Sequence, residues 1–351
     1  MLAVPATVGT GTTARSSEFR RTSFVEPNVG TPKSRAAEIQ GMRGRSFALA
    51  AGAGIAAIGN RALGRAGGAL PPALAGDQDY YRWRGMEVAY AALGDPDDPP
   101  VVLLHDVGVV GTSREFAGVA EALAEDHRVY APDLPGYGRS DRPPLTYSAS
   151  IYEAFVGDFL AEVPDHDAGR PAVVASGLTA SYAALAAPRA DVERLVLVTP
   201  AADTDGRSVA RRALVRSPVL GTAIYNWLTS TAGLRNGAVG DRYYGRPDQE
   251  YVEYCWQSAH QPGARFAPAS YLSGYLDPTM DLETALADVD ADVTLLWGRE
   301  STDPSLAEGR ALAEATDARL VVVDYAKRLP HLEHPTETLA ALELGLVPAN
   351  A

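Results

Sequence analysis

Residues 171–187 read Pro171-Ala-Val-Val-Ala-Ser-Gly-Leu-Thr-Ala-Ser-Tyr-Ala-Ala-Leu-Ala-Ala187, and this stretch decides how the chain is interpreted. Ala172 to Ala175 is a short apolar run, typical of a strand that is buried on both faces. A turn on small residues follows, and then a segment rich in alanine, the best helix former. The sequence therefore predicts a strand that ends near Ala175, a sharp turn, and a helix that starts by Thr179.

A strand, a sharp turn and a helix are the shape of a nucleophile elbow, in which G-x-S-x-G places a serine at the tip of the turn. Here the five positions read Ala175-Ser-Gly-Leu-Thr179, so Gly177 stands at the tip. Three interpretations stay open. The nucleophile is missing, it has moved by one residue to Ser176, or the stretch is an ordinary buried strand entering a helix.

The chain is acidic and contains enough apolar residues for a sizeable core. The 351 residues are 46% hydrophobic and carry a net charge of −13, and Lys33 and Lys327 are the two lysines of the whole sequence. An acidic surface with little lysine suits a salty solvent, so we favour a halophilic source, with a high-GC genome as the alternative. Because the acidic body would repel phosphates, we expect no nucleic-acid partner.

Cysteine and histidine usage gives no indication of a metal or a cofactor. The single cysteine, Cys255, excludes an internal disulfide and a cysteine-based metal cluster. The six histidines show no metal-ligand spacing such as H-E-x-x-H. We therefore predict no cofactor and no metal site.

The N-terminal part differs from the rest. Residues 1–41 have no apolar period, and we expect a disordered extension. Residues 42–76 are expected to be a short apolar segment and a linker. Within them, a basic head precedes the apolar residues 46–59, which resembles a signal peptide or a weak membrane anchor. The alternatives are a packed helix and a translation start at Met42 instead of Met1. We expect a cytoplasmic protein, with a membrane-associated or exported one as the alternative, and the oligomeric state stays open.

Apolar runs that alternate with helical patterns predict an α/β fold with a doubly wound, mostly parallel sheet. We expect the core to comprise residues 77–200 and 289–351. Residues 201–288 interrupt the alternation with helical, Tyr- and Trp-rich sequence. We interpret them as a helical cap inserted over the carboxyl ends of the strands, where open α/β sheets bind ligands.

Four motifs then appear in order. Asp133-Leu-Pro-Gly-Tyr-Gly-Arg-Ser-Asp141 matches a D-x-P-G-x-G-x-S-D loop, and the other three are Val101-Val-Leu-Leu-His105, Leu295-Leu-Trp-Gly298 and Leu329-Pro-His-Leu-Glu-His-Pro335. Between about Tyr80 and Val347 the chain resembles the α/β-hydrolase superfamily. It is most similar to the capped branch with haloalkane dehalogenases, haloperoxidases and epoxide hydrolases.

The chain departs from this superfamily where the resemblance implies catalytic residues. The nucleophile position is Gly177, the acid position is Ser301 and the base position is Arg328. The family's His-Gly pair reads His105-Asp106, which puts a carboxylate beside the expected oxyanion hole. The resemblance places Asp106, Val107 and Leu178 in the oxyanion and pocket region.

Replacement residues lie nearby in the sequence. Ser176 is a candidate nucleophile, His331 a candidate base and Asp303 a candidate acid, and Asp203 or Asp205 are alternative acids. For His331 we favour a structural role at the start of the last helix. Since a triad acts as a unit, several simultaneous replacements favour reduced or lost catalysis.

Two functions follow. The first is a hydrolase of a small, apolar, ester-like substrate with an atypical or lost triad. The second is a non-catalytic homologue that binds a small molecule or a protein partner through the cap pocket. Fold analogy alone does not decide between them.

Overall fold

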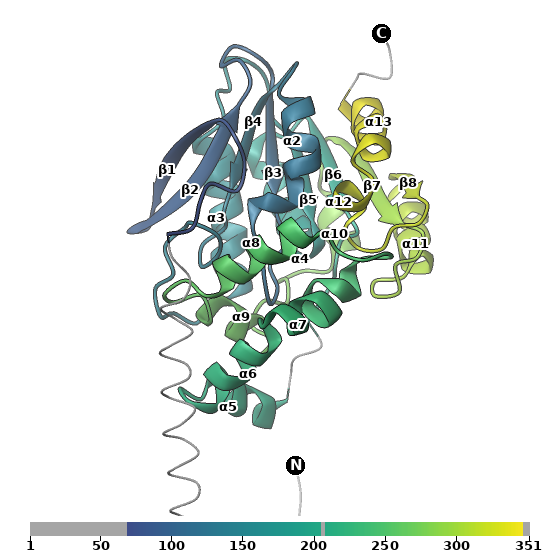
Figure 1. Ribbon diagram of the computed structural model, residues 1–351. Helices are drawn as coiled ribbons and strands as arrows, with labels where there is room; N and C mark the ends of the chain where they lie inside the picture. The colour runs from purple at the N-terminus through teal and green to yellow at the C-terminus, as the bar shows by residue number, and fades with distance from the viewer. Residues whose placement is uncertain (1–68, 205–207, 347–351) are drawn as a thin grey trace, which may run out of the picture. The chain divides into compact units, whose positions relative to one another are not determined.

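The computed structural model describes residues 69–204 and 208–346 (Figure 1). All of these lie within the compact unit Gly52–Ala351. The predictions for residues 1–41 and for the apolar segment 46–59 fall outside the described residues. No helix in the described ranges is long and apolar enough to cross a bilayer.

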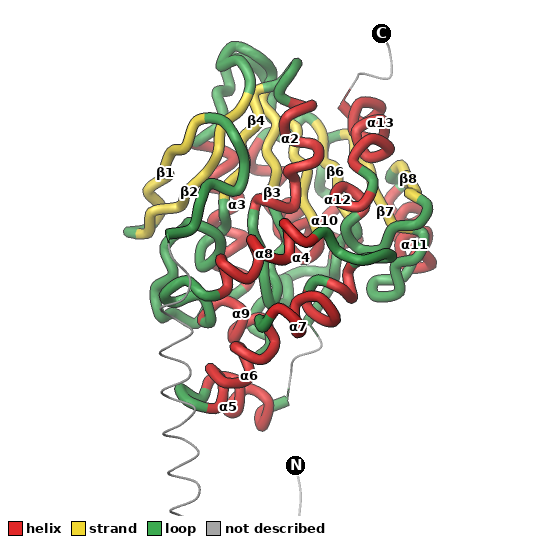
Figure 2. The backbone as a smooth tube through the Cα atoms, in the orientation of Figure 1, coloured by secondary structure: helices red, strands yellow, loops and turns green. Residues whose placement is uncertain are grey.

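Eight strands form one sheet, in the order β1-β2-β4-β3-β5-β6-β7-β8 (Figure 2). The strands are β1 (Asp77–Trp83), β2 (Met86–Leu93), β3 (Pro100–Leu104), β4 (Arg128–Pro132), β5 (Ala172–Ser176), β6 (Arg194–Val198), β7 (Asp292–Gly298) and β8 (Arg319–Val323). Strand β2 pairs antiparallel with β1 and β4, and β3 to β8 pair in parallel. The predicted mostly parallel, doubly wound sheet is confirmed.

Helices cover both faces of this sheet. They are η1 (Ser113–Phe116), α2 (Ala117–Leu123), α3 (Ala149–Glu162), α4 (Gly177–Ala190), α11 (Leu306–Thr316), α12 (Pro330–Glu333) and α13 (Pro335–Leu346). In β3, Val102 and Leu104 pack into a core with α3 and α4, whereas Val101 and Leu103 pack into a second core with α2 and α13. The continuous apolar run of this strand therefore reflects burial on both faces.

The segment between β6 and β7 is helical where it is described. It contains α5 (Val209–Arg216), α6 (Leu220–Leu228), α7 (Thr231–Gly233), η2 (Leu234–Ala238), η3 (Gly240–Arg242), α8 (Gln249–Ala259), α9 (Phe266–Tyr271) and α10 (Leu282–Ala287). Tyr225, Leu234, Tyr251 and Cys255 form a separate apolar cluster here. Helix α10 instead packs its apolar side chains into the main core with α4.

The loop that follows β4 is held by its own polar side chains. The Asp133 carboxylate accepts hydrogen bonds from the backbone N–H groups of Ser113 (2.9 Å) and Arg139 (2.8 Å). Gly138 has a φ of +51°, and a Cβ atom there would overlap the Asp133 carboxylate. Ser140 bridges to β2 by accepting from the Ala89 N–H at 2.9 Å. The D-x-P-G-x-G-x-S-D sequence is therefore explained by the architecture of the loop.

The residues just before β1 already pack against the body. Ala73 and Leu74 are buried in the core that contains α2, and Tyr254 donates a hydrogen bond from its hydroxyl to the Pro71 carbonyl at 2.9 Å. Residues 69–76, the part of the segment 42–76 that the structure describes, therefore pack on the core.

Candidate functional site

The turn from β5 into α4 has the geometry of an elbow. Ser176 is the last residue of the strand, with extended dihedral angles, and Gly177 begins the helix with a φ of +56°. This left-handed conformation favours glycine at the tip. The predicted strand, sharp turn and helix are therefore present, with the strand one residue longer and the helix starting two residues earlier than the limit set from the sequence.

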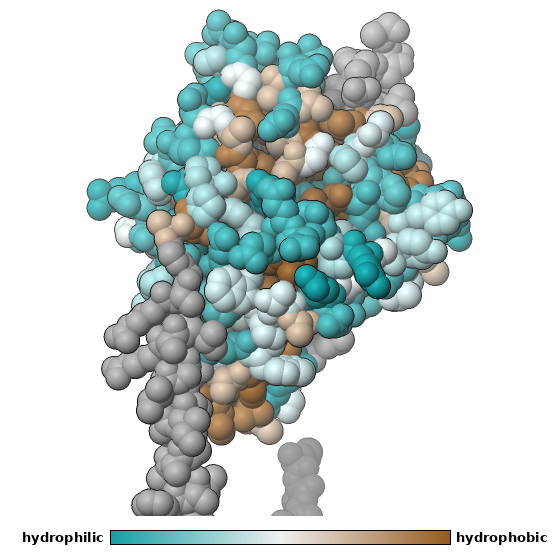
Figure 3. Space-filling model, in the orientation of Figure 1, coloured by the Kyte–Doolittle hydropathy of each residue, from teal (hydrophilic) through white to brown (hydrophobic). Residues whose placement is uncertain are grey.

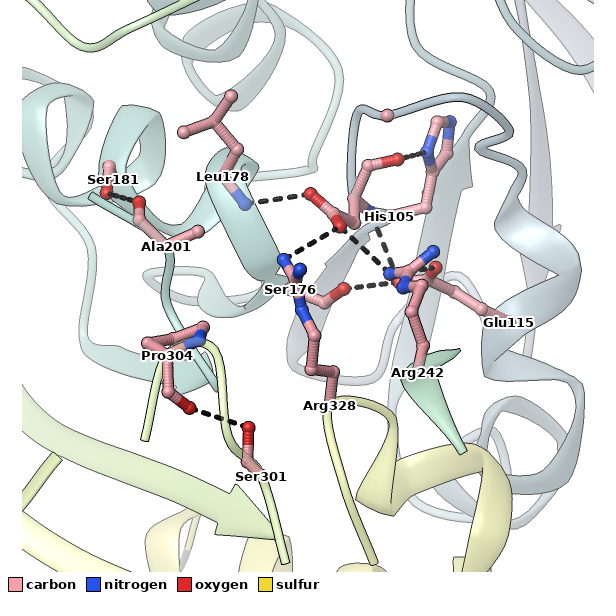
Figure 4. Close-up of polar contacts among 12 residues, drawn as sticks. His105, Glu115, Ser176, Leu178, Ser181, Ala201, Arg242, Ser301, Pro304 and Arg328 are labelled. Carbon is pink, nitrogen blue, oxygen red and sulfur yellow. Dashed lines mark hydrogen bonds and ion pairs between the residues drawn. The ribbon is translucent and has the colours of Figure 1, made fainter. Parts of the chain in front are cut away.

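The Asp106 carboxylate occupies the space in front of the elbow tip. Asp106 follows β3 and is buried, and a Cβ atom at Gly177 would overlap all three atoms of its carboxylate group. Its Oδ1 accepts a hydrogen bond from the Leu178 N–H at 2.8 Å (Figure 4). In a nucleophile elbow, the N–H of the residue after the tip is an oxyanion donor. This donor is therefore already bound to a carboxylate of the same chain.

Two arginines neutralise this carboxylate. The Arg242 guanidinium, from η3, donates to Asp106 Oδ2 at 2.9 Å, and Arg328 approaches the same oxygen at 3.8 Å. Burial would lower the pKa of Arg242, but the charges of Asp106 and Glu115 raise it overall. Arg328 stands at the predicted base position, and a guanidinium offers no acceptor for a proton.

A second carboxylate, Glu115, lies behind the first and is fully buried. Its Oε1 accepts from the Asp106 N–H at 3.2 Å and from the Ser176 hydroxyl at 2.6 Å. Burial alone would raise the pKa of Glu115, but the interactions with His331 and then with Arg242 lower it to about 2. Glu115 is therefore charged near neutral pH.

The sequence-predicted candidates do not assemble into a nucleophile, base and acid. Ser176 donates to Glu115 and is fully buried, and His331 Nε2 lies 3.6 Å from the same Glu115 oxygen, beyond a hydrogen bond. The His331 ring stacks on Phe116, with ring centroids 4.8 Å apart. The carboxylate thus stands between the serine and the histidine, whereas catalysis needs the histidine in the middle.

The candidate acid lies elsewhere. Asp303 and Asp203 line a cavity, and within residues 69–204 and 208–346 neither carboxylate is hydrogen-bonded or ion-paired to Ser176 or His331. Ser301, at the position where the resemblance implies an acid, donates its hydroxyl to the Pro304 carbonyl at 2.6 Å. Asp205 lies outside the described residues.

His105 supports Asp106 from the strand side. Its Nε2 accepts from the Leu134 N–H at 2.9 Å, so Nδ1 carries the proton and donates to the Asp106 carbonyl at 2.8 Å. The sequence did not indicate roles for His105, Glu115 or Arg242. Glu115 lies 9 positions and Arg242 lies 136 positions after Asp106, and neither spacing gives a local sign of these contacts.

A cavity of about 510 Å³ opens in front of Asp106. Val107, Leu178, Tyr271, Trp297 and Arg328 line it together with Asp106, and further carboxylates line it at Asp203, Asp281, Glu283, Asp303 and Glu308. Burial, and then the charge of Asp106, raise the pKa of the Tyr271 hydroxyl, which therefore stays protonated as a donor. In the described ranges, no group of three or more His, Cys, Asp or Glu side chains is placed to hold a metal ion.

Residues 101–342 match the model of the alpha/beta hydrolase family, and the chain belongs to this family. An uncharacterized protein of Mycobacterium tuberculosis (strain ATCC 25618 / H37Rv) is 35% identical over 104 residues, which are 29% of this chain and 29% of that protein. A 3-hydroxybutyrate-oligomer hydrolase of Cupriavidus necator is 44% identical over 54 residues, which are 15% of this chain and 18% of that protein. The chain thus matches less than a third of the length of these relatives.

Solved structures share the fold. A serine hydrolase involved in carbazole degradation matches with a TM-score of 0.63 and 17% identity, over 78% of this chain and 99% of that one. The 2-hydroxy-6-oxo-6-phenylhexa-2,4-dienoate hydrolase of a Rhodococcus strain matches with a TM-score of 0.62 and 18% identity, over 77% and 98%. A bromoperoxidase of Bacillus anthracis matches with 0.58 and 18%, over 78% and 99%. At these identities the likeness establishes the fold.

The packing of Asp106 against Gly177 predicts an energetic coupling between the two positions. Gly177→Ala should destabilise the protein by about 1–3 kcal/mol more in the wild type than in an Asp106→Ala background, because the carboxylate that the new Cβ meets is then absent. Urea unfolding followed by circular dichroism measures the free energy of unfolding of the wild type, the two single variants and the double variant.

Gly85→Ala is the control for that cycle. Gly85 also has a positive φ, +83°, but a Cβ there meets no atom within 4 Å. Its cost should be the same in both backgrounds. An equal cost of Gly177→Ala in the two backgrounds would contradict the proposed overlap.

The lowered pKa of Glu115 predicts a loss of stability in acid. The pKa is about 2 in the folded protein against a usual 4.5, so the stabilisation is complete above pH 4.5 and is lost as the pH falls toward 2. The loss should be on the order of 3 kcal/mol, and it should be absent in Glu115→Gln. Urea unfolding at pH 5.5, 3.5 and 2.5 measures it.

Glu121→Gln is the matched control, because Glu121 is exposed on α2. This variant should keep the acid dependence of the wild type. If Glu115→Gln kept it as well, the pKa of Glu115 would not be lowered by the fold.

Proposed function

We propose that this member of the alpha/beta hydrolase family binds a small molecule and has lost the serine-hydrolase mechanism. The observation that carries the proposal is the position of the Asp106 carboxylate, which fills the space of a side chain at Gly177 and accepts the Leu178 N–H. A negative charge at this donor opposes the oxyanion that forms during acyl transfer.

The surrounding groups support the same conclusion. A serine nucleophile needs an imidazole that accepts its proton and a carboxylate that orients the imidazole. Here the Ser176 hydroxyl donates to Glu115 directly, and Arg328 occupies the base position. A hydrolase that uses Ser176, His331 and Asp303 would require all three side chains to move.

The cavity supports a binding role. Its volume of about 510 Å³ is in the range of small-molecule sites, which combine apolar walls with a few polar groups. Leu178, Leu282 and Trp297 supply apolar surface, and Arg328 and the Tyr271 hydroxyl supply donors next to it. The carboxylates along the wall disfavour a polyanion, so we expect a small, partly apolar ligand that carries an acceptor group.

We expect no serine-dependent hydrolysis. The unmodified protein should hydrolyse p-nitrophenyl acetate at the rate of a Ser176→Ala variant, and neither should be labelled by a fluorophosphonate probe. The assay should be run at low and at high salt, with circular dichroism to confirm that the acidic protein is folded. Rapid turnover that Ser176→Ala abolishes would establish a shifted serine nucleophile instead.

Ligand binding should depend on the cavity. Ala202 is exposed and lines the cavity. Ala202→Trp should therefore narrow the cavity without disturbing the packing of the core. In a thermal-shift screen of small aromatic and aliphatic carboxylates and esters, compounds that raise the Tm of the wild type should lose that effect in Ala202→Trp. The control Ala232→Trp, on exposed α7, should respond like the wild type. A shift that Ala202→Trp retains would place binding elsewhere.

A further inference from the structure

Helices α5 and α6 present large apolar side chains to solvent. Val209 is 79% exposed, Trp227 71%, Leu220 55% and Leu214 44%. We call these four residues the α5–α6 face. Figure 3 shows hydrophobic surface gathered at the end of the molecule where Figure 1 places these two helices. Scattered apolar residues are normal on protein surfaces, but a contiguous patch of them marks an interaction site.

The exposure is a property of an ordered helix pair. In α6, Leu220 and Trp227 are exposed and seven residues apart, so they share one side of the helix, whereas Ile224 is half-buried. The opposite side is anchored, since Tyr225 is buried and donates a hydrogen bond from its hydroxyl to the Ala259 carbonyl at 3.0 Å. The apolar stripe therefore faces outward because the inner side of the helix is already packed.

Helix α5 is also held in place. Arg211 and Arg212 donate from Nε to the carbonyls of Leu272 (2.9 Å) and Ser273 (2.7 Å). These contacts fix the helix on the body through its arginines. Val209 and Leu214 remain exposed on this anchored helix.

The charge of this segment is opposite to that of the chain. Residues 208–239 contain four arginines, at positions 211, 212, 216 and 235, and no Asp or Glu. The whole chain has a net charge of −13. A negatively charged surface would therefore be attracted to this segment and repelled by the remainder of the molecule.

We propose that the α5–α6 face docks on a membrane surface that contains anionic lipids. Apolar side chains flanked by arginines are the composition of helices that lie in the lipid interface, and tryptophan is enriched at that depth. Arg216 and Arg235 are exposed, whereas Arg211 and Arg212 are half-buried against the body. Each exposed arginine near an anionic leaflet adds attraction that salt weakens. A membrane fits better than a protein partner, because the apolar residues project outward and the hollow beside Val215 and Ile224 has no room for an inserted side chain.

Sedimentation with lipid vesicles tests this proposal on the full chain. The protein should bind vesicles of equal phosphatidylcholine and phosphatidylglycerol, and it should bind pure phosphatidylcholine at least tenfold more weakly. Raising NaCl from 0.15 to 0.5 M should weaken binding to the anionic vesicles. Equal binding to both vesicles, or no binding to either, would overturn the proposal.

A double variant identifies the face that binds. Leu220→Ser with Trp227→Ser should lower the partition coefficient for anionic vesicles at least tenfold and leave the circular dichroism spectrum unchanged, because both side chains are exposed. Tyr80→Ser with Tyr325→Ser is the matched control, since these exposed tyrosines lie on β1 and after β8. It should bind like the wild type.

Two outcomes of this comparison would overturn the proposal. If the double variant binds vesicles as tightly as the wild type, attachment occurs elsewhere, for example through residues 46–59. If the wild type is a dimer by light scattering, binds no vesicles, and becomes monomeric with the double variant, then the α5–α6 face contacts a second copy of the chain. Neither outcome depends on whether the cavity binds a ligand.

Discussion

A buried group of charges at the end of β3 is the constraint on which the candidate site depends. Asp106 and Glu115 are both buried, and Arg242 lies 2.9 Å from the first and 4.0 Å from the second. Buried charges are tolerated when they are paired and hydrogen-bonded, and removing one partner leaves the others at a cost of several kcal/mol. Because the arginine comes from the segment between β6 and β7 and the carboxylates come from the core, the group ties these two parts of the chain together at the carboxyl ends of the strands.

Asp106, Gly177 and Arg328 all depart from the family pattern, and the three residues are sterically and electrostatically compatible with one another. With a carboxylate at Asp106, a side chain at Gly177 has no space, so glycine at the elbow tip follows from the change beside it. A cation at Arg328 also suits a neighbouring carboxylate better than a neutral base does. The three residues therefore describe one rearranged site instead of three independent losses, and this agreement supports the proposed loss of hydrolysis.

Local pattern predicted most of the fold, because each parallel strand is an apolar run and each loop carries its own turn residues. The elbow and the Asp133 loop were found in this way. The charge group was not, since Arg242 meets Asp106 across 136 positions and Glu115 sits in a helical pattern where a glutamate is normally exposed. The same limit applies to α10, whose place in the main core depends on its contact with α4. Sequence could name Ser176, His331 and Asp303 as candidates, but it could not show that a carboxylate lies between the first two.

The alternation of side chains along β5 explains why Ser176 is not a displaced nucleophile in this arrangement. Successive residues of a strand point to opposite faces, so Ser176 lies on the same face as Val174, whereas position 177 faces Asp106. Moving the serine to the cavity would require a one-residue shift of β5 along the sheet. This shift would break the pairing of Ser176 with Val198 of β6, and it would turn the core side chains of β5 to the opposite face. It would also remove the hydroxyl that Glu115 accepts from, in a site where this buried carboxylate has few other donors. The register of β5 and the buried Glu115 carboxylate therefore both keep Ser176 away from the cavity.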